Sequence, residues 1–103
     1  MADPDTCYCG VEDLLRVIRR RYSLAVLNVV HARGGARFHD VESALASAST
    51  STLADTLRAL TAARLLERKE IPDAALRTSY TITPSGAKLL NRFRRLLEDI
   101  RPD

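Results

Sequence analysis

The sequence predicts a mainly α-helical fold that carries one small β-hairpin, and three observations support this. Apolar residues recur with helical spacing in five separate segments. Before the last of these, a short region alternates apolar and polar residues beyond a Pro-Asp turn. No segment has the composition of an interdomain linker, and 103 residues suffice for one core. We therefore expect a single domain over residues 1–103, with residues 1–10 as a flexible N-terminal segment.

The first three helices are predicted by the spacing of their apolar residues. Between Val11 and Ile18 these residues fall on one helical face. The segment from Leu24 to Val30 is apolar on nearly every side and is followed by glycines at 34 and 35, which predicts a central buried helix. A short third helix is expected between Phe38 and Leu45, because its apolar residues again share one side.

The fourth helix is expected to follow the Ser/Thr-rich residues 47–52, whose hydroxyl groups suit a helix N-terminus. Leu53, Leu57 and Leu60 define its buried side. Rotation by about 100° per residue places small or polar residues on the opposite side: Ser51, Thr52, Asp55, Arg58, Ala59 and Ala62. A short helix, a tight connection and such a second helix are typical of the helix-turn-helix, whose second helix enters the major groove of DNA.

A hairpin and a long helix complete the predicted order. Residues 66–71 and 77–83 are expected to be strands on either side of Pro72-Asp73. Thr83 and Pro84 suit the start of a last helix, whose wide apolar stripe runs to Ile100. A hairpin directly after the second helix of a helix-turn-helix forms a wing, so the predicted fold is a winged helix-turn-helix.

We expect DNA contacts on the fourth helix and on the wing. An arginine such as Arg58 can bind guanine or phosphate, and Asp55 can accept a hydrogen bond from the amino group of cytosine. The expected contacts of the recognition helix are Ser49, Thr50, Ser51, Thr52, Asp55, Thr56 and Arg58. Those of the wing and its flanks are Arg37, Arg68, Lys69 and Arg77. The alternative is that these residues form ordinary solvated surface.

Composition excludes several classes of function. The 16 basic and 13 acidic residues give a net charge of +3, which suits a polyanionic partner without requiring one. No segment approaches the roughly 18 apolar residues of a membrane span, and the N-terminus is unlike a signal peptide, so we expect a cytoplasmic protein without membrane contact. The Ser/Thr cluster has no histidine base nearby, and no phosphate-binding glycine loop is present. We therefore expect no enzyme and no cofactor.

Several short motifs, in their order and spacing, resemble a known family. In chain order they are Cys9-Gly10-Val11-Glu12, Arg19 with Arg20-Arg21-Tyr22, Arg37-Phe38-His39-Asp40-Val41, Leu53 with Leu57-Arg58-Ala59-Leu60, Leu65-Leu66-Glu67-Arg68, then Pro72, Arg77 and Tyr80, and Thr83 with Gly86. From Cys9 to about Leu90, the sequence is similar to the HxlR family of winged-helix regulators. Tyr22 replaces the tryptophan of the family pattern.

The resemblance implies a homodimer, built largely from the first and last helices, that binds a two-fold related operator in double-stranded DNA. The dimerisation residues expected on these helices are Leu14, Ile18, Leu89, Phe93, Leu96, Leu97 and Ile100. The recognition helix departs from the family, which often has lysine, glutamine and arginine where this chain has Ser51, Asp55 and Thr56. This departure implies an unusual base preference or low affinity, and a flatter salt dependence.

The two cysteines have two open interpretations. Redox-sensing members of the family use a cysteine at the position of Cys9, and a helix N-terminus there can lower the pKa of the thiol and favour the thiolate. Neighbouring acidic residues oppose this effect. A disulfide between Cys7 and Cys9 would close a small, strained ring, so a bond to the other subunit or to a small thiol is easier to form. Otherwise the pair is inert.

The sequence also bears on a metal site and on a partner other than DNA. Besides Cys7 and Cys9, only His31 and His39 are available as soft metal ligands, so we expect no metal site. The acidic residue at Asp55 and the sparse positive charge of the fourth helix favour a second function, a winged-helix module that binds protein and little or no DNA. The sequence predicts no particular small-molecule effector.

Overall fold

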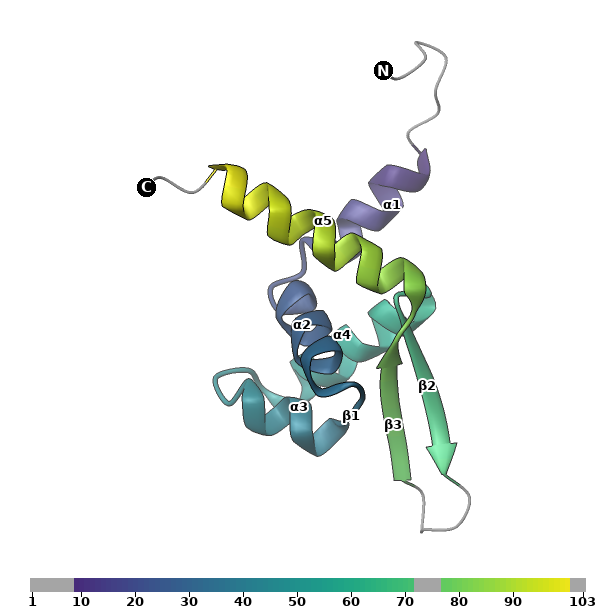
Figure 1. Cartoon of the computed structure of the whole chain (residues 1–103). Coiled ribbons are helices and arrows are strands. Elements are labelled where there is room, and N and C mark those ends of the chain that lie inside the picture. Colours follow the sequence, from purple (N-terminus) through teal and green to yellow (C-terminus); the bar gives the residue numbers. More distant parts are fainter. Residues whose placement is uncertain (1–8, 72–76, 101–103) are drawn as a thin grey trace.

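The computed structural model describes residues 9–71 and 77–100. In chain order its elements are α1 (Cys9–Ile18), α2 (Ser23–Arg33), β1 (Ala36–Arg37), α3 (Phe38–Ala44), α4 (Thr50–Ala62), β2 (Leu66–Ile71), β3 (Arg77–Ile82) and α5 (Pro84–Ile100). Figure 1 shows α1 and α5 at one end of the molecule and the β2–β3 hairpin extending away from them, beside α2, α3 and α4. The predicted mainly helical winged helix-turn-helix is confirmed.

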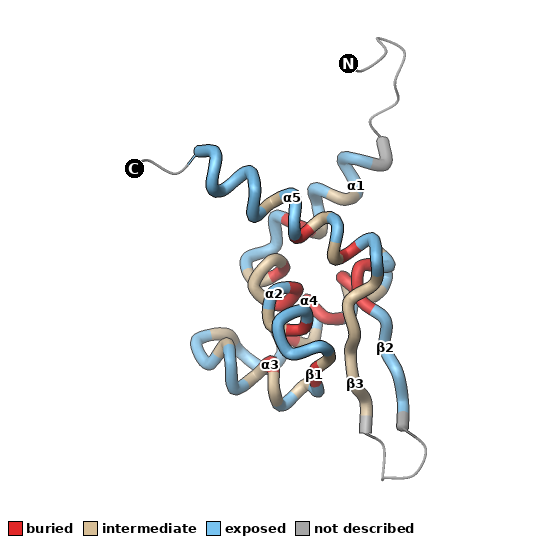
Figure 2. The backbone as a smooth tube through the Cα atoms, viewed as in Figure 1, coloured by how far each residue is buried: buried red, intermediate tan, exposed pale blue. Residues whose placement is uncertain are grey.

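The core lies between α2 and α4. Val26, Leu27 and Val30 of α2 have no exposed surface, and the three leucines that define the buried side of α4 are at most 1% exposed. Figure 2 shows these buried segments at the centre of the tube, flanked by α3, α5 and the strands. The prediction that α2 is the central helix is confirmed, and α4 is held against it by its leucines.

A third strand, β1, was not predicted. The sheet has the order β1-β3-β2 and is antiparallel throughout. β1 pairs Ala36 with Tyr80 and Arg37 with Ser79, while β2 starts the hairpin register with Leu66 opposite Ile82. Two residues are too few to show the alternation of apolar and polar residues that predicts a strand. The residues of β1 form a strand through their pairing with β3. The pairing fixes the start of α3 next to the wing.

A polar joint connects the end of the recognition-helix segment to α5. The Thr83 hydroxyl lies 2.7 Å from the carbonyl oxygen of Arg64 and accepts the N–H of Gly86 at 3.0 Å. The Thr83 N–H donates to the Leu65 carbonyl at 3.1 Å. A side chain at Gly86 would collide with that same carbonyl oxygen, so only glycine allows this approach. The joint therefore ties the segment between α4 and β2 to the start of α5.

The first helix begins two residues earlier than the apolar spacing indicates, and the flexible N-terminal segment over residues 1–10 stays a prediction. Cys9 and Gly10 belong to α1, which begins at Cys9 instead of near Val11. The remainder of that predicted segment, residues 1–8, lies outside the described residues.

Candidate nucleic-acid interface

The polar side of α4 is the centre of the candidate interface. Ser51, Asp55 and Arg58 are exposed, Thr52 is half-buried, and the leucines of the opposite side are buried. Ser49 caps the helix, because its Oγ accepts the N–H of Thr52 at 3.2 Å. The N-terminal half of α4 thus presents small and polar groups to the outside, without a bulky side chain that would block a DNA groove.

Thr56 does not belong to this surface, which corrects the sequence prediction. The residue is 1% exposed, and its hydroxyl donates to the carbonyl oxygen of Thr52 at 2.8 Å. One position along a helix is enough to turn a side chain by about 100°, which places Thr56 beside Leu53 and Leu57. Its hydroxyl is satisfied within the helix and has no route to DNA.

Two further hydroxyls at the start of α4 already have partners inside the protein. Thr50 Oγ1 donates to Glu42 Oε2 of α3 at 2.7 Å. The Ser49 hydroxyl lies 2.8 Å from the Thr52 hydroxyl, in addition to its capping bond. The first bond joins α3 to α4 and the second lies within the first turn of α4, so these hydroxyls already have partners in the protein.

Asp55 and Arg58 form an ion pair that the sequence prediction missed. Arg58 Nη1 donates to Asp55 Oδ1 at 3.1 Å, and the two side chains remain 76% and 54% exposed. The signal was their i, i+3 spacing, which brings two side chains together on one helix. These are the only charged residues of α4, so the helix carries no net charge.

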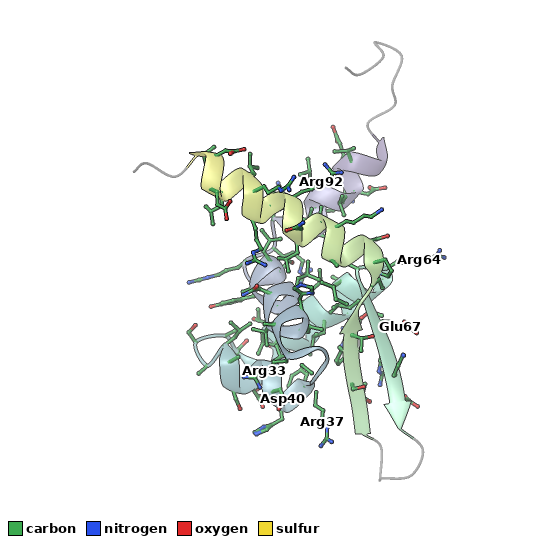
Figure 3. All side chains as sticks on the ribbon, viewed as in Figure 1. Arg33, Arg37, Asp40, Arg64, Glu67 and Arg92 are labelled. Carbon is green, nitrogen blue, oxygen red and sulfur yellow. The ribbon has the colours of Figure 1, made fainter. Side chains whose placement is uncertain are left out.

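The flanks of α4 supply the positive charge that the helix lacks. Arg37 is exposed at the junction of β1 and α3, and Figure 3 shows it at the end of the molecule toward which the hairpin extends, near Arg33 and Asp40. Lys69 of β2 is exposed as well. In the part of the chain that the structure describes, neither cation takes part in an ion pair.

The remaining wing residues differ in their surroundings. Arg68 Nη2 lies 3.5 Å from Glu70 Oε1, so its charge is partly offset on the same strand. Arg77 begins β3 opposite Ile71, but its side chain, like residues 72–76, lies outside the described residues. The predicted tip of the wing therefore remains a prediction.

A second surface is apolar and lies at the end of the molecule that carries α1 and α5. Its most exposed large residues are Val11, Leu15, Leu96, Leu97 and Ile100, between 47% and 67% exposed. Beside it, α2 and α5 enclose a groove of about 520 Å³, lined by residues that include Leu24, Phe93 and Leu97. So much exposed apolar area on two helices at one end of the molecule is typical of a protein–protein interface.

The exposure of the apolar residues of α1 differs from what the dimerisation residues expected from the sequence would require. Ile18 is only 8% exposed and packs within the subunit, so it offers little surface to a partner. Leu14 is half-buried, whereas Val11 and Leu15 on the same helical stripe are about half exposed. The apolar period of α1 alone could not separate the residues that face the core from those that face outward.

The two cysteines lie at or before the start of α1. Cys9 is the first residue of α1, but its side chain and all of Cys7 lie outside the described residues.

Within residues 9–71 and 77–100 no three His, Cys, Asp or Glu side chains gather as metal ligands would. Over the same residues, no helix has the length and apolar character needed to cross a bilayer.

A family model described as HxlR-like helix-turn-helix matches residues 17–101. The chain belongs to this family. The resemblance found in the sequence motifs is thereby confirmed, and the matched region includes α4, the wing and α5. No curated protein matches the sequence.

Solved structures with the same fold are transcriptional regulators. A putative transcriptional regulator of the MarR family from Enterococcus faecalis V583 has a TM-score of 0.81 at 23% identity, over 95% of this chain and 89% of that one. Diamide-treated YodB from B. subtilis has a TM-score of 0.76 at 20% identity, over 96% and 99%. The redox regulator HypR in its oxidised form has a TM-score of 0.73 at 21% identity, over 92% and 100%. Like those proteins, this HxlR-like chain combines a helix-turn-helix with a wing.

Proposed function

We propose that this HxlR-like protein is a sequence-specific DNA-binding transcription regulator that acts in the cytoplasm as a homodimer on a two-fold related operator. The observation that carries the proposal is the exposed polar side of α4, together with an exposed cation on β2, which packs against α4, and another on β1, which directly precedes α3. A helix of this kind suits the major groove, and cations beside it suit the phosphates. The family assignment and the regulator neighbours support the same function.

The homodimer is supported by the apolar surface of α1 and α5. Its five most exposed large side chains are about half exposed or more. A second copy of the chain would remove this area from water, at about 25 cal/mol for each Å². A two-fold dimer also explains how two recognition helices reach two half-sites, because operator symmetry mirrors protein symmetry.

A gel-shift experiment with the DNA upstream of the protein's own gene tests the proposal. We expect a shifted complex at low salt, and weaker complexes for Arg58→Ala and Arg77→Ala variants that remain dimers. Unchanged affinity in both variants would contradict the placement of the interface. No binding at low salt by a folded dimer would contradict the DNA-binding function itself.

One observation favours a second function, a winged-helix module that binds protein. The ion pair of Asp55 and Arg58 leaves α4 without net charge, whereas most DNA-binding surfaces are strongly positive. Under this alternative, a partner protein would cover α4 and the dimer would bind DNA weakly at every salt concentration. The gel-shift experiment above separates the two functions.

We also propose that Cys9 makes the regulator sensitive to oxidants. In support, Cys9 starts α1, next to the proposed dimer surface, and two neighbours of the same fold are a diamide-treated and an oxidised regulator. Diamide should change DNA binding of the wild type and leave Cys9→Ser unaffected. An identical response of the two proteins would exclude the role of Cys9, and a Cys7→Ser variant shows whether the second thiol is needed.

A further inference from the structure

The ion pair on the exposed side of α4 needs an explanation beyond stability. Asp55 and Arg58 are the only charged residues between Thr50 and Ala62, and both remain more than half exposed while their side chains touch at 3.1 Å. An exposed pair of this kind adds little to the stability of a protein. An unpaired cation on a helix that faces DNA would also raise the affinity for DNA. Asp55 removes this gain because it pairs with the only cation of α4.

We propose that Asp55 and Arg58 together read one G·C base pair, with the guanidinium donating to guanine and the carboxylate accepting from cytosine. This inference rests on the DNA-binding function proposed above and adds the specificity of the site. It assigns base selection to a pair of residues whose opposite charges cancel, and not to a cation alone.

The hydrogen bond within the pair leaves free the donors and the acceptor that contact with a G·C base pair requires. The bond within the pair uses Arg58 Nη1 and Asp55 Oδ1. Among the described residues, the other guanidinium nitrogens and Asp55 Oδ2 have no protein partner. Since the two side chains are held together from positions i and i+3, free donors and a free acceptor lie side by side on one surface.

A G·C pair presents the complement of this arrangement in the major groove. Guanine offers two acceptors, O6 and N7, and the neighbouring cytosine offers its N4 amino donor. When A·T replaces G·C in the same orientation, the thymine O4 acceptor faces the carboxylate and the adenine N6 amino donor faces the guanidinium. Neither side chain then finds its complement, because an ionised carboxylate only accepts and a guanidinium only donates. Asp55 therefore favours G·C and penalises A·T, which Arg58 alone does less sharply.

The same carboxylate lowers affinity for DNA of any sequence. The carboxylate brings a negative charge toward the phosphates. It also bonds to Arg58, the only cation of α4, and so offsets that positive charge. Sequence-independent attraction then depends on the exposed Arg37 and Lys69, which have no ion-pair partner among the described residues. A regulator that binds non-specific DNA weakly discriminates better between its operator and other sequences, because non-specific sites compete for it in large excess.

The experiment first selects duplexes from a random library with the wild-type protein, which defines its half-site. Affinities are then measured for duplexes in which each base pair of the half-site is replaced in turn, with the wild type, Asp55→Asn and Glu70→Gln. Glu70→Gln is the matched control, because it makes the same change of charge in an exposed ion pair with Arg68 on β2. Circular dichroism confirms that each variant folds.

We expect the wild-type half-site to contain a G·C pair whose replacement by A·T weakens binding by about 10-fold or more. Asp55→Asn should lose most of that discrimination and bind random DNA more tightly, whereas Glu70→Gln should keep the discrimination. Full discrimination in Asp55→Asn at every position, or a half-site without a preferred G·C pair, would overturn the inference while the DNA-binding function stands. No binding of any duplex by the folded wild type would overturn that function.

Discussion

At the scale of single residues, the site depends on which side chains the helix turns outward and what they already bond. The leucine spacing predicted the exposed side of α4, and Ser51, Asp55 and Arg58 do lie there. Thr56 was wrongly included, because the family comparison that suggested it follows sequence position, whereas burial follows helical rotation. The pairing of Asp55 with Arg58 depends on side-chain conformation, which an apolar pattern does not contain.

The different surroundings of Thr56 and Arg58 lead to opposite expectations for two variants. Thr56→Val replaces a buried hydroxyl that bonds only the helix backbone, so affinity for the operator should stay within about 2-fold, a change of under 0.5 kcal/mol. Arg58→Ala removes a group that faces the groove and should cost about 1–3 kcal/mol. Fluorescence anisotropy with a labelled operator measures both. A larger loss for Thr56→Val than for Arg58→Ala would reverse the assignment of the helix faces.

Gly86 offers a test of the joint between α4 and α5. A Cβ at this position would meet the carbonyl oxygen of Leu65 and the side chain of Ile82, so Gly86→Ala should lower the free energy of unfolding by about 1–3 kcal/mol. Urea denaturation provides the measurement. The control is Ser85→Ala, an exposed change in the same turn, which should stay within about 0.5 kcal/mol. Equal stability of Gly86→Ala and the wild type would show that the joint tolerates a side chain.

At the scale of the elements, the sequence predicted the five helices and the hairpin because each repeats its pattern over several residues. The boundaries of β2 and α4 follow directly from local signals, a Pro-Asp turn and a capping serine. β1 has two residues, and its pairing with β3 joins positions more than forty residues apart, as Ala36 and Tyr80 are. No local signal contains such a pairing, so the third strand was not predictable, although Arg37 was expected among the residues that flank the wing.

The wing is expected to contribute affinity and not base selection. Lys69 is exposed on β2, faces no described ion-pair partner and suits a phosphate. Lys69→Ala should weaken binding to all duplexes by a similar factor and reduce the slope of log affinity against log salt by about 1. Titrations at several salt concentrations, with the selected duplex and a scrambled one, measure this effect. A loss confined to the selected duplex would mean that Lys69 reads bases.

At the scale of the whole molecule, hydrogen bonds connect the candidate DNA-binding surface to the proposed dimer surface. Figure 1 shows α1 and α5 at one end of the molecule and the hairpin extending away from them. The bonds of Thr83 with the segment after α4 connect the two surfaces. The positions of two recognition helices in a dimer would then follow from how two copies of α5 pack.

The dimer surface is tested by a charge placed in its centre. Leu97 is 51% exposed in the chain alone and lines the groove between α2 and α5. Leu97→Glu should leave the fold intact and shift the protein to a monomer, because a carboxylate would be buried without a partner. Size-exclusion chromatography with light scattering reports the mass. Asn91→Glu adds the same charge at another exposed position of α5 and should remain a dimer; a dimeric Leu97→Glu would contradict the proposed surface.

The most direct test of the central claim is selection of duplexes from a random library by the wild-type dimer at low salt, about 50 mM. We expect enrichment of an inverted repeat whose half-sites lie one helical turn of about 10 base pairs apart, or a multiple of that spacing. Each half-site should contain a G·C pair opposite Asp55 and Arg58. A folded dimer that enriches no sequence, or only a single asymmetric site, would contradict the claim.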